Sequence, residues 1–238
     1  MIDIFVPVYN EAENIEQLFE GLKEKVYVDF EVMIVYDSDD DNTLPVIERI
    51  KDNYDFNIRL EKNHYGKGAC NAFRTGMESV KNDYVVFTMA DLSDSLETIN
   101  EMKKKLDDGY DMVVGSRYMK GGKKEGDSFL KTVFSKAAGR AMHCLIGIPT
   151  VDISNGFKMY KREVVDKIKL ESTVGFEIGL ELTMKTFIYG YKIIEIPAQW
   201  KDREAGESNF QMWNWIPNYL HWCFWAIKER WFGKRRLK

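Results

Sequence analysis

The chain has 238 residues, with 34 basic and 38 acidic side chains and a formal net charge of −4. This length fits one α/β domain with an appendage, and 45% hydrophobic residues argue against intrinsic disorder. Three widely spaced cysteines without Cys-x-x-Cys spacing argue against a disulfide framework and a zinc site, and they indicate a reducing compartment.

The charge is divided unevenly along the chain. Residues 1–212 carry 28 basic and 37 acidic residues, a net charge of −9, whereas residues 213–238 carry six basic residues and one acid. Five of the six tryptophans also lie in this second part. We therefore expect an acidic globular domain over 1–212 and a basic, aromatic tail over 213–238. The acidic body would repel a polyanion, so we do not expect a nucleic-acid partner.

Runs of apolar and β-branched residues predict strands that are buried on both faces. In chain order they are Ile2–Val8, Glu31–Tyr36, a weaker run at Asn57–Glu61, Asp83–Met89, Tyr110–Gly115 and Tyr191–Ala198.

Helical patterns alternate with these runs. We expect Asn10 to cap a helix whose inward face is formed by Ile15, Leu18, Phe19 and Leu22. We expect Ser95 to cap another, which ends at Gly109 and has an inward face of Leu96, Ile99, Met102 and Leu106. This alternation predicts a mostly parallel sheet covered by helices.

Ligands of such sheets bind beyond the carboxyl ends of the strands. The residues there are mostly acidic, with one arginine: Tyr9–Glu11, Asp37–Asp41, Ala90–Asp94 and Ser116–Arg117. The first strand is not followed by Gly-x-Gly-x-x-Gly, no Walker-type loop is present, and Gly66-Lys67-Gly68 has neither spacing. These patterns favour a diphosphate that is bridged to acids by a metal.

Seven segments occur in an order that resembles one enzyme family. They are PVYNEAENI (7–15), VYDSDDDNT (35–43), GKGACNA (66–72), MADLSD (89–94), GSRYMKGG (115–122), SNGFKMY (154–160) and REAGESN (203–209). Together they are similar to the inverting GT-A glycosyltransferases related to dolichol-phosphate mannose synthase, over roughly the first 210 residues. The resemblance implies an α/β fold of GT-A type, with a mostly parallel sheet flanked by helices; our reading of the tail adds a C-terminal amphipathic helix.

The resemblance also implies a site for a nucleoside-diphosphate sugar. The matching positions are Pro7, Tyr9, Asn10, Glu11, Asp37, Lys67, Ala90, Asp91, Arg203 and Ser208. Tyr36 stands where the family usually has a first acid before Asp37, and Asn209 stands where it often has Lys. The alternative for Arg203, without a role in function, is a surface ion pair with a neighbouring acid.

Asp91 matches the last acid of the family's Asp-x-Asp motif, which binds a divalent cation such as Mg²⁺ or Mn²⁺. Met89 replaces the first acid, so Asp94 or Ser93 would have to help, directly or through water. Asp94 has an alternative interpretation as an acid at the N-terminus of a helix near Ser95. We take Asp91, Asp94 and Arg117 as the candidate catalytic residues.

By the same resemblance, Arg117, Lys131 and Ser135 would hold the phosphate of a polyprenyl phosphate acceptor. Such a phosphate is already largely ionised near neutral pH and needs no general base. Two alternatives stay open: a hydroxyl acceptor with Asp94 as the base, and a catalytically weak sugar-nucleotide-binding subunit, suggested by Met89 and Tyr36.

Three further residues, Asp152, Asn155 and Glu177, flank the sugar and acceptor region by resemblance. Asn155 has an alternative role in a turn with Gly156. Glu177 and Glu181 are four residues apart, a spacing that is common for solvated acids on a helix.

In the tail, one arc of a helical wheel is apolar and aromatic: Trp215, Ile216, Tyr219, Leu220, Trp222, Cys223, Ala226 and Ile227. We expect an amphipathic helix that begins at Pro217 and ends near Gly233. Tryptophan flanked by Lys and Arg favours the surface of a bilayer. A helix docked on the body, or on a second copy in a homo-oligomer, is the alternative.

The sequence shows no secretory leader, and the apolar stretch Ile216–Ile227 is shorter than the about 20 residues that span a bilayer. We therefore expect a cytoplasmic protein, peripheral on the inner face of a membrane.

Overall fold

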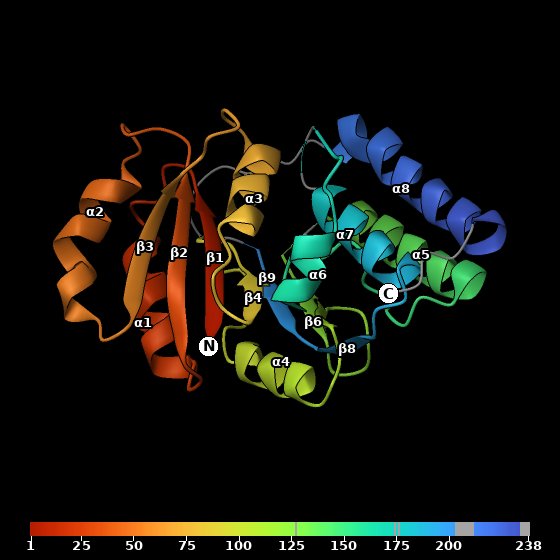
Figure 1. The fold of residues 1–238 in the computed structure, drawn as a ribbon, viewed down its shortest axis with the longest axis horizontal. Helices are drawn as coiled ribbons and strands as arrows, with labels where there is room; N and C mark the ends of the chain where they lie inside the picture. The colour runs from red at the N-terminus through yellow and green to blue at the C-terminus, as the bar shows by residue number, and fades with distance from the viewer. Residues whose placement is uncertain (127, 174, 176, 203–211, 234–238) are drawn as a thin grey trace.

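The computed structural model describes residues 1–126, 128–173, 175, 177–202 and 212–233. Its centre is a seven-stranded sheet in the order β3-β2-β1-β4-β7-β5-β8 (Figure 1). The strands are β1 (Ile2–Val8), β2 (Phe30–Tyr36), β3 (Asn57–Lys62), β4 (Tyr84–Phe87), β5 (Met112–Ser116), β7 (Lys158–Lys161) and β8 (Ile193–Pro197). All six predicted strands are present, and β1 has the predicted bounds.

Strand β7 was not predicted. It lies between β4 and β5 and runs antiparallel to both, whereas the other neighbouring pairs of the large sheet are parallel. The expectation of a mostly parallel sheet flanked by helices is confirmed.

The helices are α1 (Ile15–Lys25), α2 (Thr43–Ile50), α3 (Ala69–Glu78), α4 (Thr98–Asp107), α5 (Phe129–Ile146), α6 (Arg162–Lys167), α7 (Glu177–Ile188) and α8 (Met212–Phe232), with a short 3₁₀ turn at Lys51–Asn53. Alternate residues of β1 point to opposite faces, as the pleat requires. Ile4 packs with residues of α1, α2 and α4 on one face, and Phe5 packs with residues of α3, α6 and α7 on the other.

Both predicted helix starts were wrong, although the residues predicted to face inward are buried; one of them, Leu96, lies before α4 and not on it. Asn14, not Asn10, precedes α1, which begins at Ile15, and Asn10 lies in the turn after β1 with a φ of 58°. Glu97, not Ser95, precedes α4, and Ser95 instead contacts Thr98 through its hydroxyl at 2.8 Å. The apolar faces of both helices are buried.

A small parallel sheet joins β6 (Lys123–Glu125) to β9 (Gln199–Lys201). The other side of β9 lies against the segment after β4: Ser95 and Lys201 donate backbone hydrogen bonds to Gln199 O and Ser93 O, at 3.1 and 3.0 Å. The segment between β4 and α4 is therefore held by backbone contacts with β9.

The tail helix α8 starts at Met212, so Pro217 lies inside the helix and the predicted start was wrong. Trp222 and Ala226 are buried in a third hydrophobic cluster with residues of α5 and α7. The Trp222 Nε1–H donates to the Ser172 hydroxyl at 2.9 Å. The helix docks on the body, as one of the two alternatives held; the Trp215 side chain lies outside the described part.

Within the described ranges, no helix has the length and apolar character that crossing a bilayer requires.

Candidate active site

The loops that follow β1 and β2 are tied together by side chains at the carboxyl edge of the sheet. The backbone N–H of Asn10 donates to both carboxylate oxygens of Asp41, at 3.1 and 3.2 Å. The backbone N–H of Glu11 donates to the Thr43 hydroxyl at 2.9 Å, and the Glu11 carboxylate accepts from Asn14 at 2.6 Å. Asn10 and Glu11 are therefore held at this edge by hydrogen bonds from their backbone to side chains of the loop after β2 and the start of α2.

Asp37 follows β2 and holds the glycine-containing loop before α3. Its Oδ1 accepts from Asn63 Nδ2 at 2.7 Å, and its Oδ2 accepts from the backbone N–H of Gly68 at 2.8 Å. Asn63 Nδ2 also donates to Gly66 O at 2.7 Å. The conformation of this loop requires glycine at two positions, since Gly66 and Gly68 have φ of 92° and 121°. Asp37 and the loop that carries Lys67 are thus brought together.

The other predicted nucleotide-sugar residues take different places. Pro7 is half-buried within β1, and Ala90 is buried after β4. Tyr9, directly after β1, and Lys67, in the loop before α3, are exposed. Arg203 and Ser208 lie outside the described residues.

The segment after β4 carries the two candidate catalytic acids. The backbone N–H of Ser93 donates to Asp91 Oδ1 at 3.1 Å, and the Thr88 hydroxyl donates to Asp94 Oδ2 at 3.0 Å. Between them Leu92 has a φ of 61°, a conformation that non-glycine residues rarely adopt. Both acids therefore lie in the segment that directly follows β4, at the carboxyl end of that strand.

Burial raises the pKa of Asp94 to about 7, and the nearby negative charge of Asp91 acts in the same direction. The Thr88 hydroxyl, Arg117 and the backbone of Met89 oppose this shift. Asp94 therefore lies close enough to both Asp91 and Arg117 for their charges to change its pKa. The sequence suggested the three residues but not the Thr88 contact.

The donor set at Asp91 and Asp94 fits a hard divalent cation. Both residues offer carboxylate oxygens, and a bound cation would offset the negative charge of Asp91 that helps to raise the pKa of Asp94. Among the described residues there is no cluster of three or more His, Cys, Asp or Glu side chains for a metal. A cation here would need further oxygen ligands from outside the described protein, as a diphosphate provides.

Arg117 follows β5 and is held by Asp152. Its Nε and Nη2 each donate to a different oxygen of the Asp152 carboxylate at 2.8 Å, and its backbone N–H donates to the same group at 2.9 Å. The Asp152 side chain is fully buried and that of Arg117 nearly so. Burial alone would raise the pKa of Asp152, but Arg117 holds it below its ordinary value.

A short polar chain connects Arg117 to α5. The Arg117 Nη2 reaches the Ser154 hydroxyl at 3.4 Å, and Ser154 and Ser135 share a hydrogen bond of 2.6 Å between their hydroxyls. Lys131 is half-buried one turn before Ser135 on the same helix. The predicted acceptor set thus occupies adjoining elements, and Ser154 is a member that the motif matches alone did not single out.

Two neighbouring groups differ from expectation. Glu177 and Glu181 are fully buried, so their interpretation as solvated acids is wrong. Glu181 accepts from the backbone N–H of Glu171 and Ser172 and pairs with Lys185 at 2.6 Å, which compensates its charge inside the protein.

Lys158, on β7, is a further buried ionisable residue, and the sequence analysis did not single it out. Its amine donates to Ile153 O, Gly179 O and the Thr183 hydroxyl, at 2.7 to 3.2 Å. Burial lowers its pKa to about 7; Asp152 opposes this change and Arg117 adds to it. The amine braces the segment that carries Asp152 and Ser154 against α7.

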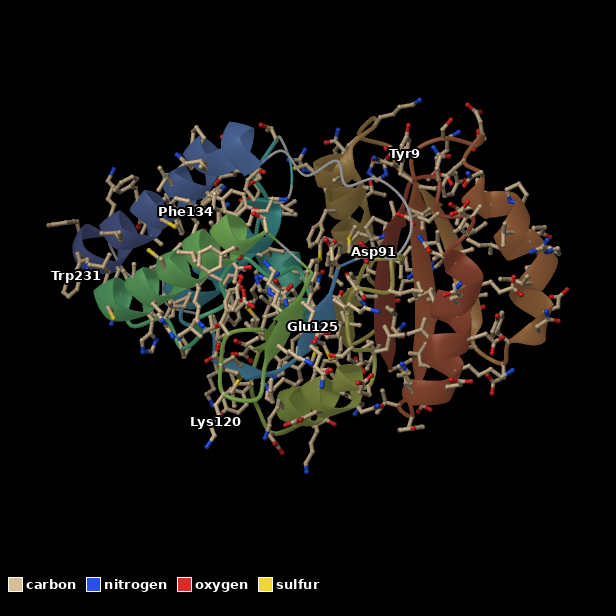
Figure 2. The ribbon with its side chains drawn as sticks, turned by 180° about the vertical axis from the view of Figure 1, so that it is seen from behind. Tyr9, Asp91, Lys120, Glu125, Phe134 and Trp231 are labelled. Carbon is tan, nitrogen blue, oxygen red and sulfur yellow. The ribbon has the colours of Figure 1, made fainter. Side chains whose placement is uncertain are left out.

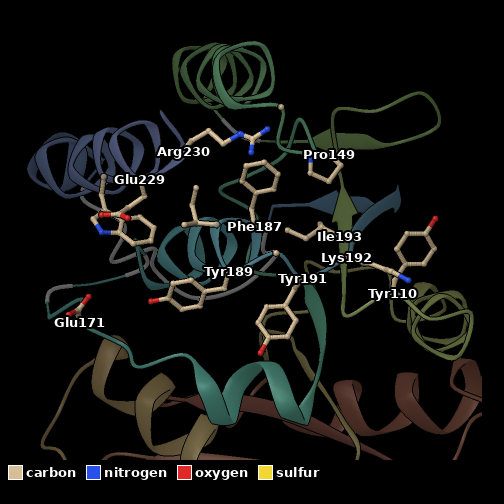
Figure 3. A pocket seen from close by; sticks show the side chains of 14 residues that line it. Tyr110, Pro149, Glu171, Phe187, Tyr189, Tyr191, Lys192, Ile193, Glu229 and Arg230 are labelled. Atoms are coloured by element: carbon tan, nitrogen blue, oxygen red, sulfur yellow. The ribbon is translucent and has the colours of Figure 1, made fainter. Parts of the chain in front are cut away.

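A cavity of about 650 Å³ lies elsewhere, and its lining comes mainly from the end of α7, the start of β8 and α8 (Figure 3). Phe187, Tyr189, Tyr191 and Trp225 contribute aromatic rings. None of the predicted site residues lines it. The candidate active site is therefore defined by the polar contacts above and not by this cavity.

Comparisons with known proteins show the family of the chain and the similarity of its fold. Residues 3–169 match the model of the family described as "Glycosyl transferase family 2". A dolichol-phosphate mannosyltransferase of Pyrococcus furiosus is 29% identical over 215 residues, which are 88% of this chain but 59% of that protein. A polyprenol monophosphomannose synthase of Mycolicibacterium smegmatis is 27% identical over 95% of this chain and 87% of its own.

Solved structures are similar in fold. Glucosyl-3-phosphoglycerate synthase from Mycobacterium tuberculosis with UDP has a TM-score of 0.69 at 15% identity, over 95% of this chain and 80% of its own. A mannosyltransferase from Pyrobaculum calidifontis with GDP-Man and Mn²⁺ has a TM-score of 0.66 at 20% identity, over 94% and 62%.

Proposed function

Because the chain belongs to glycosyl transferase family 2, we propose that it transfers a sugar from a nucleoside-diphosphate sugar to a polyprenyl phosphate, with inversion at the anomeric carbon. The observation that carries this proposal is the juxtaposition of an acidic pair, Asp91 and Asp94, with a rigidly held Arg117. The acidic pair suits a diphosphate with its cation, and Arg117 suits a second phosphate.

On the donor side, Asp37 is proposed to recognise the base and ribose from its place beside the 63–68 loop. The other nucleotide-sugar residues would surround the same ligand: Pro7, Tyr9, Asn10, Glu11, Lys67, Ala90, Arg203 and Ser208. Both curated relatives are named for mannose, which makes GDP-mannose the first donor to test.

Asp91 would hold Mg²⁺ or Mn²⁺, and Asp94 would complete the ligands directly or through water. When bound, such a cation neutralises charge on the departing nucleoside diphosphate. Thr88 fixes the orientation of Asp94, and the turn at Leu92 fixes the spacing of the two acids.

On the acceptor side, Arg117, Lys131 and Ser135 would hold the phosphate. An oxygen of this phosphate attacks the anomeric carbon while the bond from that carbon to the donor diphosphate breaks, so one displacement inverts the centre. The nucleophile is ionised before it attacks, so the protein has to orient it and offset its charge. Asp152 holds the Arg117 guanidinium in place for this task.

An acceptor carried by lipid implies work at a membrane, and we place the protein peripherally on its inner, cytoplasmic face. Its basic tail would contribute to the contact.

The decisive experiment supplies the purified protein with GDP-mannose or a panel of labelled UDP and GDP sugars, Mn²⁺ or Mg²⁺, and a polyprenyl phosphate. We expect label to enter the lipid fraction as a glycosyl phosphate with inverted configuration. Transfer to a saccharide or lipid hydroxyl and not to the phosphate would contradict the acceptor assignment. Nucleotide binding without turnover on any acceptor would contradict the enzymatic one.

A further inference from the structure

The small sheet of β6 and β9 has one face open to solvent and one that is half covered. Successive side chains of a strand point to opposite faces. The middle residue of each strand, Lys124 in β6 and Trp200 in β9, is half-buried, whereas the residues on either side of it are exposed. Lys124 and Trp200 are also direct partners in the register of the two strands, so they share the covered face.

Asp94 extends this pair to a row of three. It forms an isolated antiparallel bridge with Trp200, at the edge of β9 opposite β6. Residues that lie opposite each other on paired strands carry their side chains on the same face. The row begins three residues after Asp91 and ends one residue before Glu125, both of which are labelled in Figure 2. The indole of Trp200 is therefore the middle of the row, beside a candidate catalytic acid.

Tyr118 connects the other end of the row to Arg117. The Lys124 ammonium lies 5.3 Å from the centre of the Trp200 indole and 5.9 Å from that of the Tyr118 ring. It also donates to the Tyr118 hydroxyl at 3.4 Å. The guanidinium carbon of Arg117 lies 5.1 Å from the centre of the Tyr118 ring. Trp200, Lys124 and Tyr118 thus form a connecting wall between Asp94 and Arg117.

The connecting wall spans the distance between the two halves of the proposed site. In the proposed reaction, the anomeric carbon is bonded to the donor diphosphate and is attacked by the acceptor phosphate. We assign the diphosphate and its cation to Asp91 and Asp94, and the acceptor phosphate to Arg117. The sugar lies between these two phosphates, so a wall that joins the two halves flanks the sugar. This placement rests on the proposed function.

The side chains of the connecting wall suit a pyranose. A pyranose has faces of apolar C–H groups, which pack on aromatic rings, and a rim of hydroxyls, which accept hydrogen bonds from ammonium and phenol groups. Trp200 offers the ring, and Lys124 and Tyr118 offer the donors. Strand β9 has backbone hydrogen bonds on both edges, to β6 and to the segment of Ser93 and Ser95, which hold the indole in one position.

We propose that Trp200 is a specificity-determining residue of the donor site, whose indole packs on the pyranose ring of the nucleoside-diphosphate sugar. Lys124 binds hydroxyls on the rim of the same ring. Neither residue lies within the seven segments that resemble the family. Because these contacts are made with the sugar and not with the nucleotide, substitutions should affect the binding of the two parts of the donor differently.

The first test compares a nucleotide sugar with its nucleotide by calorimetry, with GDP-mannose and GDP as probes in the presence of Mn²⁺. If the labelled panel identifies a UDP sugar as the donor, that sugar and UDP replace them. Trp200→Ala should lose at least about tenfold in affinity for the nucleotide sugar and stay within about twofold for the nucleotide. Trp200→Phe, which keeps an aromatic ring, should recover most of the loss.

The matched control is Gln199→Ala, which changes an exposed side chain on the other face of the same strand. It should alter neither affinity. An equal loss for nucleotide sugar and nucleotide in Trp200→Ala would show that the indole only packs the small sheet, and it would overturn the proposal.

Indole fluorescence gives a readout that a purely structural role would not change. The nucleotide sugar should alter the tryptophan emission of the unaltered protein more than the same concentration of nucleotide does. This difference should vanish in Trp200→Phe, since the other five tryptophans remain. A difference that persists in Trp200→Phe would place the sugar against another tryptophan and overturn the proposal.

Lys124→Met tests the contact with the rim of the sugar. It removes the ammonium and keeps most of the apolar stem. The ratio of kcat/KM for two epimeric donors, GDP-mannose and GDP-glucose, should change by at least about threefold, because a hydroxyl partner is lost. An unchanged ratio would overturn the role of Lys124.

Failure of this proposal and failure of the proposed function give different results, because donor binding needs no acceptor. If Trp200→Ala transfers sugar to a polyprenyl phosphate with an unaltered KM for the donor, the sugar contact is overturned and the proposed function stands. A loss of affinity that depends on the sugar, in a protein that glycosylates no phosphate, would support the contact and contradict the proposed function.

Discussion

Arg117 and Asp152 form a two-pronged ion pair in which both Arg117–Asp152 side-chain contacts measure 2.8 Å. The backbone N–H of Arg117 adds a third hydrogen bond to the same carboxylate. Because the pair is buried, its carboxylate fixes the position of the backbone just after β5. It also fixes the orientation of the guanidinium that we assign to the acceptor phosphate.

We predict that Asp152→Ala lowers the free energy of unfolding by about 3–5 kcal/mol, because it leaves the Arg117 charge buried and unpaired. Urea unfolding measures this. The control is Asp166→Ala, which removes an ion pair with Arg162 that is open to solvent and should cost less than about 1 kcal/mol. Similar losses in the two variants would contradict the role given to Asp152.

We predict that Asp91→Ala reduces sugar transfer at least about a hundredfold, since it removes the carboxylate assigned to the cation. Stabilisation of the protein by Mn²⁺ with nucleotide, measured as a shift of Tm, should disappear with it. Asp39→Ala is the matched control: it removes an exposed acid that is paired with Lys62. An undiminished rate of sugar transfer by Asp91→Ala would contradict the assignment of Asp91 to the metal.

Lys158 gives a pH dependence of stability with a definite sign. Its pKa is lowered to about 7 in the folded protein, from an ordinary value of 10.5. Between these values the unfolded chain holds a proton on this amine that the folded chain lacks. Stability from this group should therefore rise with pH, by at most about 1.4 kcal/mol per pH unit.

The measurement compares unaltered protein with Lys158→Met by urea unfolding at several pH values from 7 to 9. The difference in unfolding free energy between the two should grow in favour of the unaltered protein as pH rises. A difference that stays constant across this range would show that Lys158 keeps its ordinary pKa inside the protein.

The docking of α8 predicts the effect of a core substitution. Trp222→Ala removes a buried ring and its hydrogen bond to Ser172, and it should destabilise the protein by about 3–5 kcal/mol. Phe224→Ala, two residues later on the exposed side, should change stability by less than about 0.5 kcal/mol. Thermal or urea unfolding of the two variants distinguishes a docked helix from a loosely attached one.

Strand positions could be predicted where burial on both faces leaves a continuous apolar run, as in β1. Strand β7 escaped prediction because Lys158 and Lys161 interrupt its apolar pattern. Lys158 is tolerated there because its amine donates to three oxygens, two of which belong to α7, more than 20 residues away in sequence, and no local pattern encodes those two contacts.

The candidate site was predictable as a set of residues but not as a set of contacts. Resemblance singled out Asp91 and Arg117 through two of the quoted motifs, and Ser135 through a match outside them. The partnership of Arg117 with Asp152 spans 35 residues of sequence, and that of Ser135 with Ser154 spans 19, so neither follows from local spacing. Likewise, the spacing of Glu177 and Glu181 says nothing of the backbone donors and of Lys185 that allow Glu181 to be buried.

The antiparallel strand β7 has a consequence for how the chain assembles during synthesis. Strands β1 to β4 pair among themselves within the first 87 residues, so this half can form while the rest is still emerging from the ribosome. Strands β5 and β8 join the sheet only through β7, which is made after β5. The two halves can therefore join only after β7 has been made, and the pair of Arg117 with Asp152, which lies just before β7, can form only at that late stage of synthesis.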